Sequence, residues 1–252
     1  MSGLVRDAAA APERRVGNDA VAEAEVIGSA DGCAPFSLRV LRCVRGRSFE
    51  RTTARDEELL FVVAGHGMLI ADGRSHALEP QTGVRVAPGG RYELDNERLD
   101  DLVVVSVALR GPEPGGGGAI TVSALADAAT RSATAERTFR IVHDPDNGCT
   151  TATQFVGEIP VGAAPTHYHL YEEVIYVLEG DGVMHMNDEH TPLHAGTCIH
   201  LPARKLHTLE NSGPGVMRVL GVFRPAGSPA AAYYPDGTPA YSADEPTASL
   251  SK

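Results

Sequence analysis

The stretch THYHLYEEVIYVLEGDG, residues 166–182, holds the most informative side chains of the sequence. It contains His167 and His169, which are separated by one residue, and Glu173 four positions after His169. Side chains two positions apart in a β-strand point to the same face, so we expect the two imidazoles and the carboxylate to project together. Farther along, His207 follows a proline-containing turn. Three imidazoles and one carboxylate suit a divalent first-row metal, and an octahedral ion on four protein ligands keeps two positions open.

The second half of the chain repeats the first. FVVAGHGMLIADG, residues 61–73, parallels YVLEGDGVMHMND, residues 176–188, and VRVAPGGRYE, residues 84–93, parallels CIHLPARKLH, residues 198–207. Both halves consist of short strands separated by turns, with almost no helical periodicity. This pattern predicts an all-β protein made of two copies of one sandwich or barrel unit.

Two motifs of the second half resemble those of the cupin superfamily. The first family motif, G-x5-H-x-H-x3,4-E-x6-G, corresponds here to GAAPTHYHLYEEVIYVLEG, residues 162–180. The second, G-x5-P-x-G-x2-H-x3-N, corresponds to GTCIHLPARKLHTLEN, residues 196–211. There are two departures: Gly162 stands one residue too close to the first histidine, and Arg204 replaces the turn glycine. Neither departure removes a metal ligand.

The resemblance implies a fold of two tandem jelly-roll barrels, a bicupin, over about residues 35–225. It implies one divalent transition metal per chain, with Fe(II) favoured and Mn, Zn, Ni or Co as alternatives. The ligands that it implies are His167, His169, Glu173 and His207.

The same alignment predicts a degenerate site in the first half. Thr52 and Ala54 stand at the two histidine positions, Glu58 at the glutamate and Glu93 at the last histidine. Two carboxylates make a poor cage for a metal ion, because the number of ligands sets the affinity. We therefore expect the first barrel to be structural.

Composition suggests the following division of the chain. Residues 1–20 are expected to be a flexible tail, 21–110 the degenerate N-terminal cupin and 111–135 a Gly-rich linker. Residues 136–225 are expected to be the metal-binding cupin. The Ala-, Pro- and Ser-rich residues 226–252 are expected to be an extended or disordered tail.

Charge and composition exclude several classes of function. The 252 residues include 33 acidic and 22 basic side chains, for a formal net charge of −11, which disfavours binding to nucleic acid. No apolar run approaches the ~20 residues that span a bilayer, and the first residues lack the apolar core of a signal peptide. The four cysteines include no C-x-x-C pair. We expect a cytoplasmic protein that binds a small molecule, and a homodimer is left open.

Other residues near the motifs are weaker candidates. His200, on the strand that enters the second motif, is a candidate general acid or base, although a hydrogen-bonded structural role is commoner for such a histidine. Five side chains are expected to line a substrate pocket if their strands have the expected register, because a slip of one residue reverses the face. They are Gln154, Ile175, Val177, Met184 and Arg218.

The expected ligand set favours a small anionic substrate. A divalent ion with three neutral imidazoles and one carboxylate keeps a net charge of about +1, which attracts a chelating carboxylate, enolate, catecholate or 2-oxo acid. By the frequency of activities in the family, the resemblance implies first an Fe(II)-type dioxygenase, an oxidoreductase. The alternatives are a non-redox isomerase, cyclase, lyase or rearrangement enzyme of secondary metabolism, and a regulatory bicupin that binds a small ligand.

Overall fold

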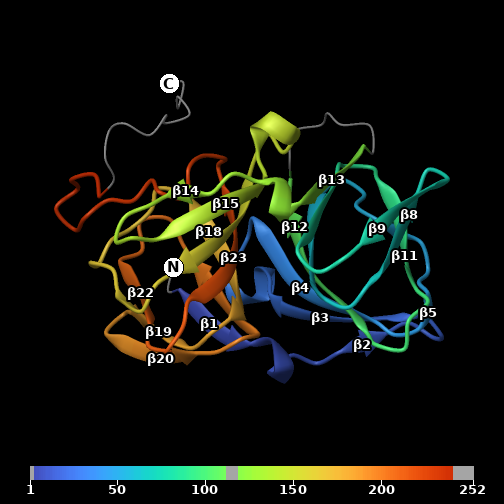
Figure 1. The fold of residues 1–252 in the computed structure, drawn as a ribbon, viewed down its shortest axis with the longest axis horizontal. Helices are drawn as coiled ribbons and strands as arrows, with labels where there is room; N and C mark the ends of the chain where they lie inside the picture. The colour runs from blue at the N-terminus through green and yellow to red at the C-terminus, as the bar shows by residue number, and fades with distance from the viewer. Residues whose placement is uncertain (1–2, 112–118, 241–252) are drawn as a thin grey trace. The chain divides into compact units, whose positions relative to one another are not determined.

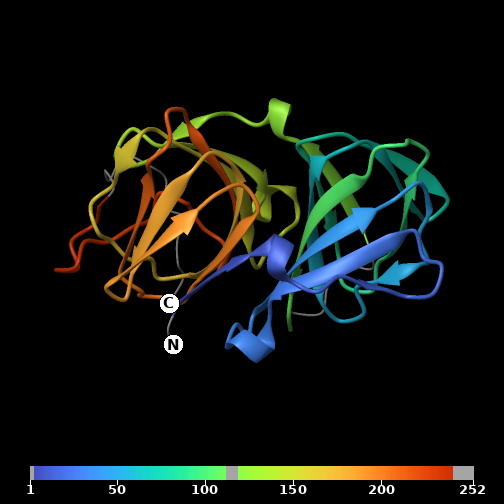
Figure 2. The same cartoon turned by 90° about the horizontal axis from the view of Figure 1, so that it is seen from below.

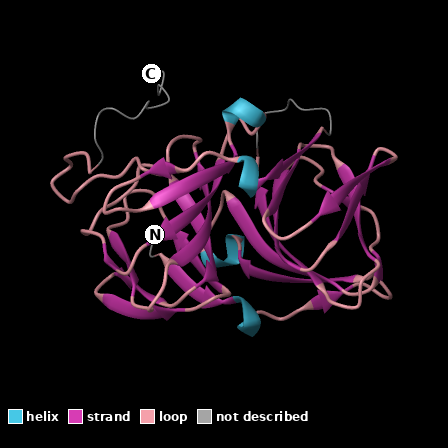
Figure 3. Ribbon diagram, in the orientation of Figure 1, coloured by secondary structure: helices cyan, strands magenta, loops and turns pink. Residues whose placement is uncertain are grey.

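The computed structural model describes residues 3–111 and 119–240, and these residues are mostly in β-strands (Figures 1 and 3). Contacts divide the chain into two compact units. We call the described residues within 7–127 the first barrel, and residues 3–6 together with 128–240 the second barrel. Figure 2 shows the strands of each unit around that unit's own interior. The predicted fold of two jelly-roll barrels is confirmed.

The first barrel consists of two sheets of antiparallel strands. The larger sheet has the order β13-β10-β7-β12-β4-β3-β2, and the smaller has the order β5-β11-β8-β9, with β6 also paired to β11. The strands are β2 (Arg14–Arg15), β3 (Val21–Ile27), β4 (Phe36–Cys43), β5 (Gly46–Arg47), β6 (Arg51–Thr52), β7 (Glu57–Ala64), β8 (Gly67–Ala71), β9 (Arg74–Leu78), β10 (Thr82–Val86), β11 (Arg91–Asn96), β12 (Leu102–Leu109) and β13 (Ile120–Ala124).

The second barrel repeats this arrangement. Its larger sheet has the order β1-β21-β18-β23-β16-β15-β14, and its smaller sheet has the order β17-β22-β19-β20. The strands are β1 (Leu4–Asp7), β14 (Arg131–Ser132), β15 (Thr138–His143), β16 (Thr153–Ile159), β17 (Gly162–Ala163), β18 (Glu172–Glu179), β19 (Gly182–Met186), β20 (Glu189–Leu193), β21 (Thr197–Leu201), β22 (His207–Asn211) and β23 (Met217–Arg224).

Helical structure in the described part of the chain is confined to single 3-10 turns, drawn in cyan in Figure 3. They are η1 (Ala8–Ala10), η2 (Ser29–Asp31), η3 (Leu125–Asp127) and η4 (Pro145–Asn147). None of these is long and apolar enough to cross a membrane.

Equivalent hairpins explain the sequence repeat. The turn between β8 and β9 has Asp72 and Gly73 at φ 51° and 72°, and the turn between β19 and β20 has Asn187 and Asp188 at φ 58° and 61°. Two consecutive left-handed residues are what a two-residue hairpin of type I′ requires, and Asn, Asp and Gly tolerate that conformation best. Along β19 the side chains alternate between buried and half-buried, so every second residue reaches the core.

The turn that leads to His207 keeps its shape without the family's glycine. Arg204 occupies the glycine position and has a φ of 63°, in the left-handed region that glycine would adopt. Its backbone N–H donates a hydrogen bond of 2.7 Å to the carbonyl of His169. The turn therefore ties the two histidine-bearing segments together, despite the substitution.

Both expected boundaries of the first barrel differ from the structure. Within residues 1–20, β1 is an edge strand of the second barrel's larger sheet, and Val5 packs against that barrel's core. Figure 1 shows β1 beside the strands of the second barrel. Within residues 111–135, β13 is an edge strand of the first barrel, paired with β10. Residues 112–118 of the expected linker lie outside the described residues.

Candidate metal centre

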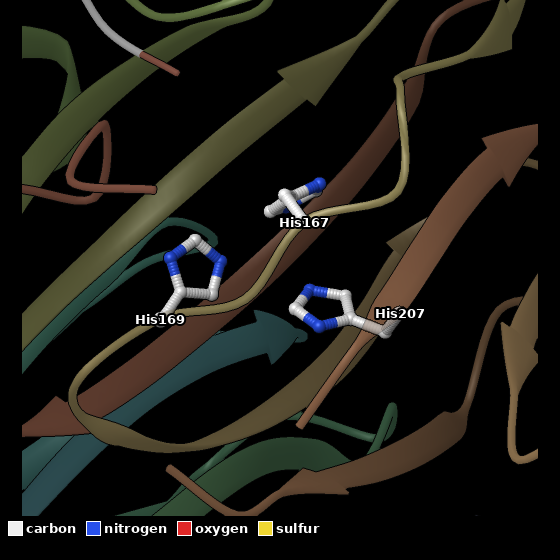
Figure 4. Close-up of side chains that lie close together, drawn as sticks. All are labelled: His167, His169 and His207. Carbon is white, nitrogen blue, oxygen red and sulfur yellow. The ribbon is translucent and has the colours of Figure 1, made fainter. Parts of the chain in front are cut away.

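Three histidines meet inside the second barrel. His167 and His169 lie between β17 and β18, in a segment that is joined to the rest of the fold by isolated bridges rather than a regular strand. His207 opens β22, and its backbone exchanges hydrogen bonds of 3.0 and 3.1 Å with His167. One ring nitrogen of each histidine lies within 4.8 Å of the other two. Figure 4 shows the three rings around one common space.

Backbone carbonyls fix the orientation of all three rings. The Nδ1 atoms of His167, His169 and His207 lie 2.8, 2.9 and 2.9 Å from the carbonyl oxygens of Pro165, Ala231 and Lys205, respectively. A carbonyl oxygen only accepts, so each Nδ1 carries the proton and each Nε2 keeps its lone pair. This is the outer-shell arrangement that metal-binding histidines need, because it selects the tautomer and holds the ring.

Burial also keeps these imidazoles neutral. Desolvation lowers the pKa of His167, holds the pKa of His207 well below its usual range and lowers the pKa of His169 to about 3. Neighbouring imidazoles lower the pKa values of His169 and His207 further. The three side chains are therefore neutral at pH 7, in the protonation state in which imidazole binds a metal.

Glu173 lies in the same cavity, although it stands outside the group of three histidines. It is the second residue of β18 and is 4% exposed, and burial raises the pKa of its carboxyl to about 8. Gly221 leaves room for it, because a Cβ at Gly221 would come within 2.8 Å of the Glu173 Oε1 atom. A buried carboxyl without a hydrogen-bond partner among the described residues is a group that a cation would stabilise in its charged form.

A cavity of about 90 Å³ opens onto these four residues. Its other walls are mostly apolar, and one basic side chain, Arg137, contributes to them. Desolvation lowers the pKa of Arg137 to about 10, and its guanidinium donates a hydrogen bond to the carbonyl of Leu209. The apolar and aromatic lining consists of Ala133, Phe139, Phe155, Ile159, Tyr171, Ile175, Met184, Leu201, Leu209, Val219, Pro229, Ala230 and Ala232.

The C-terminal segment forms part of this site, contrary to the expectation of an extended or disordered tail. Ala230 and Ala232 are buried, and with Pro229 they line the cavity. Tyr233 exchanges two backbone hydrogen bonds of 2.9 Å with Tyr168, and the two rings stack with centroids 5.6 Å apart. We call residues 228–240 the C-terminal clasp. Residues 241–252 of the expected tail lie outside the described residues.

The structure places His200 away from the cavity. Its neighbours Ile199 and Leu201 belong to the barrel core, so His200 is on the opposite face of β21. It is 1% exposed, and its Nε2 lies 2.7 Å from the Glu172 carboxylate. Its position is that of a buried, hydrogen-bonded structural histidine rather than an acid or base beside the three imidazoles.

Strand register decides which of the other predicted pocket residues line the cavity. Ile175 and Met184 line the cavity, whereas Val177 lies in the apolar core. Gln154 and Arg218 are not among the lining residues, because β16 and β23 present their neighbours instead. Phe155 and Val219, each one residue later than the predicted residue, line the cavity instead. Sequence reasoning also missed Arg137 and the C-terminal clasp.

The first barrel carries a different residue at the place of His207. Asn96 and Asn211 end equivalent strands, and each donates from Nδ2 to the carbonyl four residues later, at 2.9 and 2.7 Å. Counting back four residues from each asparagine pairs His207 with Tyr92, and not with Glu93 as the sequence alignment predicts. Glu93 instead forms an ion pair of 3.0 Å with Arg47 and is partly exposed.

Tyr92 belongs to a hydrogen-bonded polar cluster. Its hydroxyl donates to Glu58 Oε2 at 3.0 Å, and Ser106 Oγ donates to Glu58 Oε1 at 2.5 Å. Arg51 lies opposite Tyr92 in the β6–β11 pair, as His167 lies opposite His207, and it pairs with the Glu23 carboxylate. In the first barrel, Arg51 with its counter-ion Glu23 thus stands where the second barrel has the expected metal ligand His167.

Comparisons with known proteins agree with this geometry. The Cupin domain family model matches residues 155–223. An uncharacterized protein of Methanocaldococcus jannaschii, MJ1618, is 33% identical over 64 residues, which are 25% of this chain and 51% of that protein. The chain therefore spans about half the length of this curated relative.

Two solved structures resemble this chain over both barrels. Protein Ylba from E. coli has a TM-score of 0.74 at 12% identity, covering 88% of this chain and 90% of that one. The formate complex of Lactobacillus farciminis oxalate decarboxylase has a TM-score of 0.69 at 15% identity, covering 89% and 86%. At these identities the likeness shows the fold.

Proposed function

We propose a metal-dependent enzymatic function for this chain, which belongs to the cupin superfamily and is a bicupin. One divalent transition metal would be held in the second barrel by His167, His169, Glu173 and His207. The observation that carries this proposal is the set of three Nδ1–carbonyl contacts, which leaves three Nε2 lone pairs around one space.

The substrate that we propose is a small, anionic, chelating metabolite. The cavity of about 90 Å³ is far below the roughly 300–1,000 Å³ of pockets for drug-sized ligands. Its apolar walls exclude water, so charges inside it interact strongly. Arg137 adds positive charge to the centre, which favours an anion.

Two classes of reaction fit these residues. An Fe(II)-type dioxygenase is the first candidate, because four protein ligands leave two positions of an octahedral ion open. A non-redox lyase, isomerase or cyclase is the second, supported by the oxalate decarboxylase structures among the neighbours. Bound metal would supply a Lewis acid in both classes and, as Fe(II), a site for dioxygen. The protein's own residues bind the substrate, orient it and exclude water.

Metal analysis combined with an oxygen electrode tests this proposal. Anaerobically purified protein is expected to hold one transition metal per chain and to turn over a member of a panel of small carboxylic acids and 2-oxo acids. Oxygen consumption stoichiometric with product assigns the dioxygenase, and turnover without oxygen consumption assigns the non-redox class. A protein that holds no metal, or that holds metal and transforms no member of the panel, contradicts the proposal.

A further inference from the structure

Arg137 is the one basic side chain among the residues that line the metal cavity, apart from the histidines. It lies in the hairpin between β14 and β15, directly after Ala135 and Glu136, which have φ values of 57° and 58°. These are the two left-handed residues that a two-residue hairpin of type I′ requires, as in the β19–β20 turn. Here the turn brings Arg137 to the cavity.

The guanidinium of Arg137 has no carboxylate partner among the residues that the structure describes. It donates a hydrogen bond to the backbone carbonyl of Leu209, and no ion pair joins it to an acidic group in residues 3–111 or 119–240. Glu158, the other acidic group of the cavity wall besides Glu173, is paired with Arg140 at 3.0 Å. A half-buried guanidinium without a counter-ion is costly to desolvate, and an anion that enters the cavity would relieve that cost.

Arg137 and the three imidazoles of His167, His169 and His207 line the same cavity of about 90 Å³. A ligand in the cavity can therefore reach the Arg137 fork and the Nε2 lone pairs together. Planar guanidinium groups bind carboxylates through two parallel hydrogen bonds, and this geometry fixes orientation as well as adding affinity.

We propose that Arg137 is the substrate-binding residue that holds a carboxylate, so that the substrate is a small carboxylic acid oriented between this guanidinium and the metal centre. This inference rests on the proposed function, since it assigns a substrate class to the same site. The apolar wall formed by Phe139, Phe155 and Val219 would face the body of that acid. The volume restricts the acid to a few carbon atoms.

Calorimetric titration of the metal-loaded full chain with formate, acetate and pyruvate, and with the neutral amides formamide, acetamide and pyruvamide, tests this role. We expect Arg137→Met to weaken carboxylate binding by about 10- to 100-fold, the range for a charge-assisted hydrogen bond, and to leave amide binding unchanged. Arg137→Lys keeps the charge and loses the planar fork, so its affinity for carboxylates is expected to lie between those of wild type and Arg137→Met. Arg131→Met is the matched control, because Arg131 is exposed on β14, does not line the cavity and should change nothing.

The metal content of every variant separates this inference from the proposed function. If wild-type protein holds no metal, the proposed metal centre fails; the titration of metal-free protein then still reports whether Arg137 binds carboxylates. If Arg137→Met keeps its metal and binds the acids as wild type does, the role of Arg137 is wrong and the metal centre stands. If wild-type protein binds none of the three acids, the proposed role of Arg137 is also wrong. Arg137→Lys keeps the test valid if the methionine variant does not fold.

Discussion

The two barrels fill equivalent positions with opposite kinds of chemistry. In the first, Glu58 accepts hydrogen bonds from Tyr92 and Ser106, so each of its two carboxylate oxygens has a donor within the fold. In the second, Glu173 has no such donor among the described residues, and burial raises its pKa to about 8. A carboxylate that accepts hydrogen bonds is stabilised by its own barrel, whereas one without donors keeps its lone pairs for something that is not protein.

Removing a histidine tests the contrast most directly. We expect His207→Ala to lose the metal. Its metal affinity should fall by more than the roughly 10- to 100-fold that the loss of an outer-shell partner costs. Glu93→Ala should retain it, because Glu93 pairs with Arg47 in the first barrel. Elemental analysis of freshly purified variants measures this. Two metals per wild-type chain would instead assign an ion to the first barrel as well.

The pH dependence of stability isolates Glu173 in metal-free protein. Its pKa is about 8 in the folded chain against 4.5 for an ordinary glutamate, so folded protein holds a proton that the unfolded chain has released. Stability therefore falls as pH rises between these values, by up to about 1.4 kcal/mol per pH unit. The buried histidines act in the other direction, below pH 6.5, where unfolded imidazoles bind protons.

The decisive window is thus pH 6.5 to 8, where the expected loss is about 2 kcal/mol. Urea unfolding of metal-free protein across this window measures it. Glu173→Gln cannot ionise and should show a flat profile. If wild type is equally flat, the carboxyl does not have the raised pKa that distinguishes it from Glu58.

Truncation tests whether the C-terminal clasp belongs to the metal centre. Ending the chain after Gly227 removes the Ala231 carbonyl that fixes His169, so metal affinity should fall by about 10- to 100-fold. Competition with a chelator of known affinity gives the value. Deleting residues 241–252 alone is the matched control and should have no effect on affinity.

Tyr92→Phe tests the hydrogen-bonded cluster of the first barrel, and its expected effect is the smallest of these variants. Loss of the hydroxyl removes one hydrogen bond to Glu58 and should reduce the free energy of unfolding by about 1 kcal/mol. Metal content should stay at the wild-type value. A loss of metal in this variant would mean that the first barrel takes part in holding it.

The site could be predicted from sequence where its residues are close together in the chain. His167, His169 and Glu173 share a short motif, and the hairpin glycines and asparagines specify the repeat of the fold. The counterpart of His207 was misplaced because the sequence alignment matched Pro88 with Pro202, whereas the turn that leads to Tyr92 and the turn that leads to His207 have the same length. A difference of one residue turns a strand over, so Glu93 points away where Tyr92 points in.

Other parts of the site depend on contacts that local patterns do not contain. Arg137 follows a turn without glycine or proline, so its sequence carries no turn pattern to mark it. The clasp is rich in Ala and Pro, a composition typical of disorder, yet Ala230 and Ala232 are buried because small side chains fit against the cavity. Tertiary packing determines both.

Strand β1 gives the second barrel an unusual order of assembly. Residues 4–7 precede the whole first barrel in the chain, and their partner β21 follows it. The larger sheet of the second barrel is therefore completed by a pairing of very long sequence separation, which is slow to form during folding. Until it forms, β21 has a free edge that can pair with another molecule. Expression of residues 128–252 alone should for this reason give a more aggregation-prone barrel than the full chain.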